Sequence, residues 1–408
     1  MNPLSGGLLW KLQKNRNLVD ALITRRAPDF VVQRAPPDIL DHVPVFTFHV
    51  AIPERFDRQC QHLANSGFRT IDSDELKGIM LGEIKQQPRS CMLTFDDGLK
   101  QVWTVAYPIL KKYGLRATVF LVPGCMSDAS STPRKTLEHV WRGEATEGEV
   151  FGIAPGESAL ASWAEVAEMH ESGIMDFQSH TMWHSLVHKS ADLIDFGRPD
   201  YNCHYFGNIH VPIYQQQGVD KTDRELVLGM PIYSAAPRMQ VESRFFDDEG
   251  VREHCVDLVS ANGGESFFEN RNWRKIMARA FRTYKKKNSV NERFEKLSDR
   301  DIAIRKELRE AKEIIESQLP GKSVEHLCFP WYRGAEFAVD CASETGHFLT
   351  YYDAEPGFIV NVPGTSDKIT RVDETFLRRL PGEDRMSKRD VIKEVLGLRQ
   401  LPTRMFPC

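Results

Sequence analysis

The sequence lacks three features that mark large classes of proteins. It has no long hydrophobic run, no Cys-x-x-Cys pair among its eight cysteines and no surplus of basic residues. Without a run of about 18 apolar residues it offers no transmembrane helix, and without paired cysteines it offers neither a zinc ribbon nor a dithiol redox site. The 53 Lys and Arg against 57 Asp and Glu give a formal net charge of −4. This charge excludes a general nucleic-acid-binding protein, because such proteins neutralise phosphates with a surplus of Lys and Arg.

The N-terminal segment also lacks a secretory signal. Residues 1–16 show no charged stretch followed by an apolar core and a small-residue cleavage site. The leucines of this segment fit one face of an amphipathic helix, packed on the protein itself or docked on a membrane surface. Several cysteines, such as Cys91 and Cys328, lie in apolar runs, which is typical of buried thiols in a reducing cytosol. We therefore expect a cytoplasmic protein, with no indication of its oligomeric state.

Apolar runs and helical patterns alternate between 43 and 195, which is typical of an α/β fold with parallel strands. We expect strands over 44–48, 68–71, 91–95, 117–122, 174–178, 324–329 and 347–351. We expect helices over 54–65, 99–113, 298–319 and 336–344, and one that opens with a capping box at Ser162–Glu165. The alternation breaks in the middle of the chain. The predicted organisation is a helical extension over 1–42, a first barrel part over 43–195, an insertion or lid over 196–298, a second barrel part over 299–385 and a helical extension over 386–408.

Two adjacent carboxylates follow one of the predicted strands. Asp96 and Asp97 lie in the segment Thr-Phe-Asp-Asp-Gly, between the strand over 91–95 and the following helix. Adjacent like charges repel, and a bound cation relieves the repulsion if one carboxylate is its ligand and the other acts as a base. Taken alone, Asp-Asp-Gly is also a common turn.

Two histidines follow another predicted strand, over 174–178. His180 and His184 are four residues apart, a spacing that places two imidazoles on one side of a helical turn. A lone pair at this spacing also occurs by chance, but with Asp97 it forms a set of two imidazoles and one carboxylate. Three protein ligands with open positions predict a catalytic divalent metal rather than a structural one. Zn²⁺ suits this set, and Co, Mn, Ni or Fe is also compatible. His188 is expected outside the ligand set, near the site or exposed.

The two motifs together resemble a known family. Thr94–Gly98 followed by Ser179–His184 resembles the first two motifs of the NodB-type polysaccharide deacetylases, carbohydrate esterase family 4. The resemblance implies an α/β fold, a distorted (β/α)7-type barrel with a large insertion after the histidine motif. It also implies that Asp96 is the general base and that the metal ligands are Asp97, His180 and His184.

A later segment, Leu327–Gly334, resembles the third motif of this family, in which an aromatic residue follows a proline. The resemblance implies that Trp331 gives a backbone N–H to the oxyanion and that Trp331 and Tyr332 contact the substrate. Phe329 and Trp331 can also be read simply as core aromatics. The family's arginine two residues before the proline is missing, and Cys328 stands in its place.

The general acid of the family, a late histidine, is also missing. Instead, Val45–His49 resembles the permuted arrangement of the poly-N-acetylglucosamine deacetylases, which implies that His49 is the acid. The alternative is a histidine that serves only the core. Phe376–Pro381 resembles the arginine segment of that subgroup, which implies that Arg379 pairs with Asp96 and keeps it ionised.

These residues predict a metal-dependent hydrolase that removes N-acetyl groups from an amino sugar in a polysaccharide or glycan precursor. The expected partner is thus an N-acetylated carbohydrate and not a nucleic acid. Because no export signal is present, we expect a substrate assembled in the cytosol. Two alternatives stay open, since a fold and a metal site do not fix the substrate. One is another hydrolase of non-peptide amides or imides, and the other is a carbohydrate-binding protein with a degenerate site.

Overall fold

A computed structural model of the chain describes residues 43–126, 133–154, 157–201, 209–331, 334–352 and 369–373. These residues form two compact units, the first within 1–182, 308–332 and 342–407 and the second within 183–307 and 333–341. The helical extensions predicted over 1–42 and 386–408 lie outside the described residues. Within the described part of the chain, no helix has the length and apolar character needed to cross a membrane.

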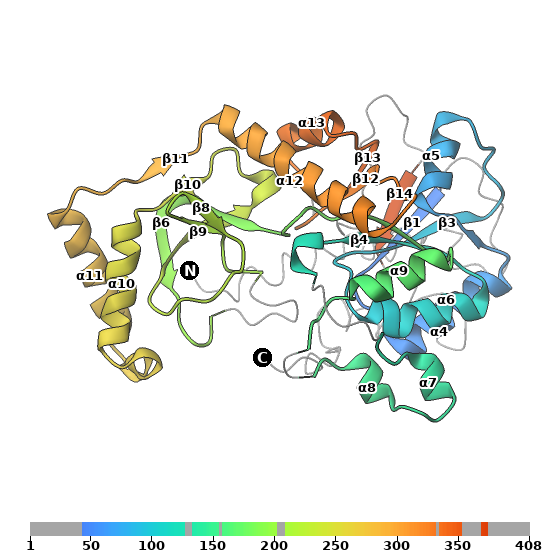
Figure 1. Cartoon of the computed structure of the whole chain (residues 1–408), viewed down its shortest axis with the longest axis horizontal. Helices are drawn as coiled ribbons and strands as arrows, with labels where there is room; N and C mark the ends of the chain where they lie inside the picture. The colour runs from blue at the N-terminus through green and yellow to red at the C-terminus, as the bar shows by residue number, and fades with distance from the viewer. Residues whose placement is uncertain are drawn as a thin grey trace, which may run out of the picture. The chain divides into compact units, whose positions relative to one another are not determined.

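The first unit is built on one parallel sheet of eight strands (Figure 1). The strand order is β13-β12-β5-β4-β3-β1-β14, with β2 beside β3. The bounds are β1 Val43–Phe48, β2 Arg69–Thr70, β3 Ser90–Phe95, β4 Ala117–Leu121, β5 Met175–Ser179, β12 His326–Phe329, β13 Leu349–Tyr352 and β14 Ile369–Asp373. Except for β14, each overlaps a strand expected from the sequence along most of its length.

The sheet curls around a small apolar interior. One buried cluster contains Val45 of β1 together with Leu349 and Tyr351 of β13. These strands are separated by four others in the sheet order, so their side chains share a cluster only because the sheet is strongly curved. The curvature and the parallel order confirm the predicted fold class, a distorted α/β barrel. The insertion that we predicted as part of this fold remains a prediction.

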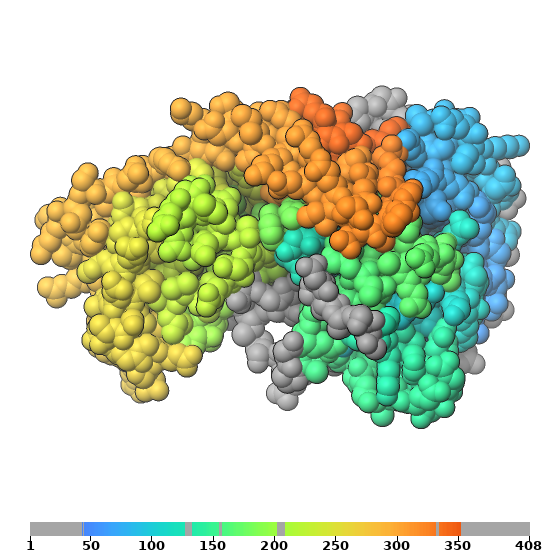
Figure 2. All heavy atoms as spheres, in the orientation of Figure 1, coloured from blue at the N-terminus to red at the C-terminus, as the bar shows by residue number. Residues whose placement is uncertain are grey.

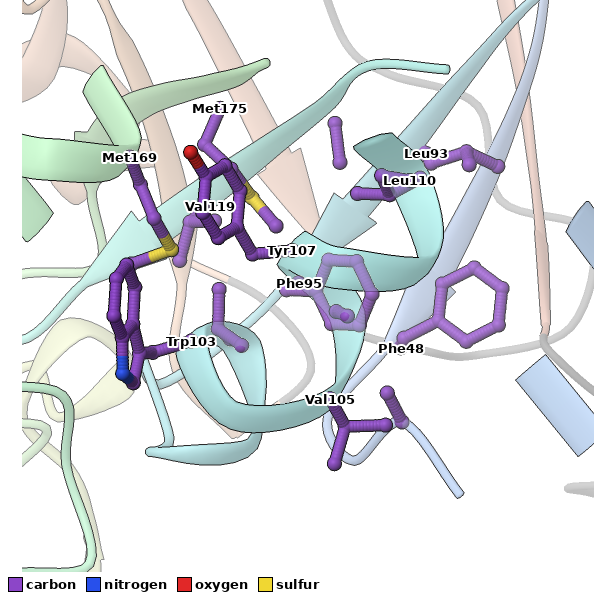
Figure 3. Close-up of a cluster of buried hydrophobic side chains, with 14 of the residues drawn as sticks. Phe48, Leu93, Phe95, Trp103, Val105, Tyr107, Leu110, Val119, Met169 and Met175 are labelled. Carbon is purple, nitrogen blue, oxygen red and sulfur yellow. The ribbon is translucent and has the colours of Figure 1, made fainter. Parts of the chain in front are cut away.

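The outer face of the sheet is covered by helices (Figure 1). Their bounds are α4 Pro53–Asn65, α6 Tyr107–Tyr113, α7 Leu137–Trp141, α8 Glu147–Phe151 and α9 Trp163–Glu171. Helix α5 (Ser73–Leu81) instead contributes Leu76 to the interior cluster. Alternate strand residues such as Leu93 and Phe95 point towards these helices, whereas Met92 belongs to the interior cluster. Figure 3 shows the outer layer, where the rings of Phe48 and Phe95 stack with centroids 5.2 Å apart.

Local signals explain where the helices begin and break. The predicted capping box opens α9, because Ser162 and Glu165 each accept a hydrogen bond from the other's backbone N–H. The helix predicted over 99–113 is divided into a π-helical turn over Val102–Ala106 and α6. Pro108 explains the division, since a proline has no N–H for the carbonyl one turn earlier and its ring crowds that carbonyl.

The second unit has antiparallel strands and two long helices. Strand β6 (Leu186–Phe196) pairs with β9 (Pro231–Pro237), although the sequence placed 186–195 in the first barrel part. The other elements of its sequence range are β7 Tyr214–Gln216, β8 Val219–Lys221, β10 Phe245–Phe246, α10 Glu249–Ala261, α11 Trp273–Lys287 and β11 Arg293–Phe294. The core of the unit joins Phe196 and Tyr233 of the strands to Val251, Met277 and Phe281 of the helices.

Two further helices follow. Helix α12 spans Leu297–Gln318 and α13 spans Glu336–Glu344. Both agree with the expected helices to within one residue at each end. The predicted apolar stripe of α12 is buried at Ile304, Leu308, Ala311 and Ile315.

Candidate metal centre

Two of the predicted site residues follow neighbouring strands at the same level. Phe48 and Phe95 are partners in the parallel pairing of β1 with β3. His49 and Asp96 are the next residues of the two strands. The backbone N–H of Asp96 donates to the carbonyl of Phe48 with an N···O distance of 2.9 Å. The carboxyl edge of a parallel sheet is where α/β proteins place ligands, and these residues lie at that edge.

The turn after β3 holds both carboxylates out of the solvent. Asp96 is 0% exposed and Asp97 is 3% exposed. Asp97 and Gly98 both adopt left-handed backbone conformations, with φ of 72° at each. A Cβ atom on Gly98 would lie 2.7 Å from Cδ2 of Leu121, so glycine is required there for two reasons. The tight turn therefore fixes the direction of the Asp97 carboxylate.

His180 follows β5 and is oriented by a neighbouring strand. It is fully buried, and its Nδ1 lies 2.8 Å from the carbonyl oxygen of Cys328 on β12. A carbonyl can only accept, so Nδ1 carries the proton and Nε2 has its lone pair available for a ligand bond. Nε2 lies 3.5 Å from Oδ1 of Asp97.

His184 reaches the site from a loop and not from the predicted helical turn. The residues from His180 to Ser185 form a loop and not a helical turn. Thr181 and His184 in this loop have φ of 65° and 51°. Such left-handed conformations are unusual for residues other than glycine and occur often at functional sites. The spacing of four residues was therefore informative, but the helical explanation for it was wrong.

Three side chains come together at this edge. Asp97, His180 and His184 are buried, and each offers one ligand atom such that the three atoms lie within 4.8 Å of one another. Two imidazoles and one carboxylate form a donor set that suits Zn²⁺ and related divalent ions. The protonated Nδ1 of His180 also matches the arrangement of metal-bound histidines, whose second nitrogen donates to a carbonyl or carboxylate. The residues thus fit a divalent ion.

The electrostatics of the site favour a cation. Burial alone lowers the pKa of a histidine, but acidic groups around His180, the Cys328 thiol and the Asp97 carboxylate foremost, raise the pKa of this imidazole well above its usual value. The position therefore favours positive charge despite being fully buried.

The second carboxylate, Asp96, contacts strand β12, which also contacts His180. Sγ of Cys328 lies 3.6 Å from Oδ2 of Asp96, in the geometry of an S–H donor to a carboxylate. Cys328 therefore contacts the candidate ligand His180 through its backbone and the carboxylate of Asp96 through its side chain. From the sequence, Cys328 is expected to be a buried thiol and a departure from the family pattern, and the structure confirms its burial.

The remaining predicted residues lie either elsewhere in the described structure or outside it. Trp331 lies in a turn two residues after β12, with φ of 57°. Tyr332 and Arg379 lie outside the described residues, so their roles remain predictions. His188 belongs to β6, where it is buried against the Tyr233 ring with centroids 5.2 Å apart. It is neither exposed nor a member of the three-residue cluster.

Sequence reasoning missed a buried polar network that joins β5 to β12 next to His180. Oε1 of Gln178 accepts from the backbone N–H groups of Glu325 and His326, at 3.0 and 2.9 Å. Its Nε2 donates to Oγ of Ser73 at 2.7 Å. Asp176 pairs with Lys322 at 2.5 Å and accepts from the same Ser73 hydroxyl. The alternation of β5 was the available signal, because residues 176, 178 and 180 share one face of the strand.

Comparison with known proteins finds a similarity in this part of the chain. Residues 83–193 match the family model for polysaccharide deacetylase. The putative polysaccharide deacetylase YxkH of Bacillus subtilis (strain 168) is 33% identical over 89 residues, which are 20% of this chain and 32% of that protein. The chain thus matches about a third of that relative's length. Residues 83–193 contain both carboxylates and both histidines. The resemblance to polysaccharide deacetylases is confirmed.

Solved structures with partial similarity include a deacetylase domain and the protein IcaB. The BpsB deacetylase domain from Bordetella bronchiseptica has 15% sequence identity and a TM-score of 0.47, over 83% of this chain and 98% of that chain. IcaB from Ammonifex degensii has 14% identity and a TM-score of 0.43, over 87% of this chain and 96% of that chain.

Proposed function

We propose that this chain, in which residues 83–193 match the polysaccharide deacetylase family, is a metal-dependent N-deacetylase of an amino-sugar glycan. The observation that supports the proposal most directly is the buried cluster of Asp97, His180 and His184 beside a second buried carboxylate, Asp96. The cluster supplies ligands and leaves Asp96 for a different task.

The metal is proposed to be held by Asp97, His180 and His184, with Zn²⁺ as the first choice. When bound, such an ion activates water and polarises a carbonyl. The contribution of His180 depends on its proton at Nδ1, which the Cys328 carbonyl holds. The contribution of Asp97 depends on the left-handed turn that directs its carboxylate.

The other residues are proposed to move protons and stabilise charge. Asp96 takes a proton from the attacking water, and general base catalysis of this kind contributes about 10²–10⁴-fold. The backbone N–H of Trp331 donates to the developing oxyanion, a contribution of about 10²–10³-fold for one donor. His49, which follows β1 at the level of Asp96, gives its proton to the departing amine. An amide nitrogen is a poor leaving group without that proton.

Two other functions are distinguished from this one by the product that they would release. A related hydrolase of non-peptide amides or imides would use the same residues but release another product. A carbohydrate-binding protein with a degenerate site would bind sugar and release nothing. The full set of carboxylates and histidines at the strand ends favours a hydrolase over a binding protein.

The test is acetate release from N-acetylglucosamine oligomers by the purified full chain, with and without a chelator. Acetate that disappears on chelation and returns with Zn²⁺ supports the proposal. Release of ammonia or a urea derivative from amide and imide substrates, without acetate, supports the related hydrolase. Sugar binding without any product supports the binding protein. Elemental analysis of the same preparation identifies the metal.

A further inference from the structure

Helix α11 (Trp273–Lys287) carries exposed basic side chains on one face. We define its basic face as the exposed residues Lys275, Arg279, Arg282 and Lys286. At about 100° per residue these four fall within a sector of about 60°. The opposite side of the helix carries Trp273, Met277 and Phe281, which are buried in the core of the second unit. The helix lies at the surface of its unit (Figure 2).

The segment itself contains no carboxylate to balance its positive charge, although Glu269 and Glu292 flank it. From Asn270 to Asn291 there are eight basic residues and no acidic one, in a chain whose net charge is −4. At the sides of the helix, Arg274 pairs with Asp195 and Lys285 pairs with Glu292, at 3.6 and 2.5 Å.

The basic face itself differs from these sides. Among the residues that the structure describes, no carboxylate forms an ion pair with any of its four members. The Nε of Arg282 donates to the backbone carbonyl of Ala278, which leaves the guanidinium charge unneutralised. Like charges three and four residues apart on a helix repel and destabilise it. The core contacts of α11 hold the helix in place, so the repulsion is retained at the surface.

A partner with a flat array of negative charge fits this face. The four side chains form a straight row of about 16 Å along the helix axis, because a helix rises about 1.5 Å per residue. A planar anionic surface meets every charge of such a row at once, and each basic residue near an anionic leaflet contributes to binding. The row has no aromatic side chain on which unpaired bases could stack. Ile276, which is 36% exposed beside the row, is compatible with contact to lipid.

We propose that the basic face of α11 docks this protein on an anionic lipid bilayer. The proposal does not depend on the deacetylase activity, since α11 contains none of the residues assigned to the metal centre.

The test is cosedimentation of the full-length protein with vesicles of phosphatidylcholine, with and without phosphatidylglycerol. We expect binding only to the anionic vesicles, with an affinity that falls as salt is added because exposed charges are screened. The variant K275Q/R279Q/K286Q should bind about fivefold more weakly for each charge removed, which corresponds to ~1 kcal/mol per basic residue near the surface. Arg282 is left intact because of its backbone hydrogen bond.

A matched control removes the same charge elsewhere. The variant K85Q/K189Q/R309Q also replaces two exposed lysines and one exposed arginine, and its vesicle binding should equal that of the wild type. Circular dichroism melts of both variants establish that they fold. Equal loss of binding in the two triple variants, binding to neutral vesicles, or a preference for duplex DNA or polyuridylate over anionic vesicles would each overturn the proposal.

Discussion

The Nδ1 atom of His180 lies 2.8 Å from the backbone carbonyl of Cys328, and this contact fixes which nitrogen of the imidazole faces Asp97. A histidine whose second nitrogen is held in this way is a more basic and better oriented ligand. Because the acceptor is a backbone atom, the position of β12 relative to β5 determines the orientation of the ligand.

The first prediction is that the two carboxylates have different roles, with Asp96 as the base and Asp97 as a metal ligand. Asp96→Asn should keep the metal and lose turnover by about 10²–10⁴-fold, because a base is removed while the three ligands stay. His180→Ala should lose both metal and turnover. Elemental analysis and acetate release on the same preparations measure the two effects. Equal metal contents in the two variants would contradict the assignment.

Gln178 is predicted to act on the metal centre without touching it. Its side chain joins β5 to the backbone of β12, and Ser179 and His180 make the next two links between these strands. Gln178→Leu leaves the N–H groups of Glu325 and His326 without their acceptor and permits the strands to shift. We expect metal affinity to fall about 10–100-fold, as found when groups that orient a ligand are removed. Isothermal titration of the metal-stripped protein measures the change.

The control for this prediction is Gln59→Leu. Gln59 is a buried glutamine of α4, a helix that carries no ligand. This variant should change the free energy of unfolding while the metal affinity stays at the wild-type value. If both variants weaken metal binding alike, the effect is a general loss of stability and not one of positioning.

Gly98 is predicted to be required for the direction of Asp97. Gly98→Ala places a Cβ 2.7 Å from Leu121 in a left-handed turn and should weaken both metal binding and stability. Gly114 has a similar φ of 65° but no atom within 4 Å of an added Cβ. Gly114→Ala should therefore cost only about 1–2 kcal/mol for the left-handed backbone and leave metal binding unchanged. Urea unfolding and metal titration of the pair separate the two contributions.

The buried pair of Asp176 and Lys322 predicts a specific pH dependence of stability. Burial raises the pKa of a carboxyl group, but Lys322 and the Ser73 hydroxyl outweigh it and hold the pKa of Asp176 below its usual value. A lowered pKa means that the ionised form stabilises the fold. This stabilisation is complete above the unfolded-state pKa of about 3.9 and is lost as the pH falls through the lower folded-state pKa.

Asp176→Asn should therefore lower the free energy of unfolding by about 3–5 kcal/mol at neutral pH, because it leaves a buried lysine without its main partner. The difference from wild type should shrink below about pH 4. Urea unfolding at a series of pH values measures it. Glu138→Gln, which breaks the exposed pair with Lys111, should cost less than about 1 kcal/mol. A difference for Asp176→Asn that persists unchanged at acid pH would count against the ion pair.

Much of the first unit was predictable because its signals are local. Apolar runs identified the buried strands, and Ser162 with Glu165 marked the start of α9. The two motifs at strand ends identified the three clustered residues, since parallel strands end at the same edge of the sheet.

Other features depend on contacts between residues distant in the sequence and could not be predicted from local patterns. Strand β6 is regular only because β9 pairs with it, and the pairing shifts register twice between His188 and Asp195. The left-handed conformation of His184 is imposed by the loop and not by its own preference. The contact between Cys328 and Asp96 joins residues 232 positions apart, and no pattern in either segment indicates it.

Cys328 contacts both His180 and Asp96, and it does so through two different groups. Its carbonyl serves His180 whatever side chain is attached, whereas its thiol alone meets Asp96. A change of side chain at this position can therefore alter the environment of the Asp96 carboxylate while the His180 imidazole keeps its tautomer, because the carbonyl that holds the Nδ1 proton belongs to the backbone.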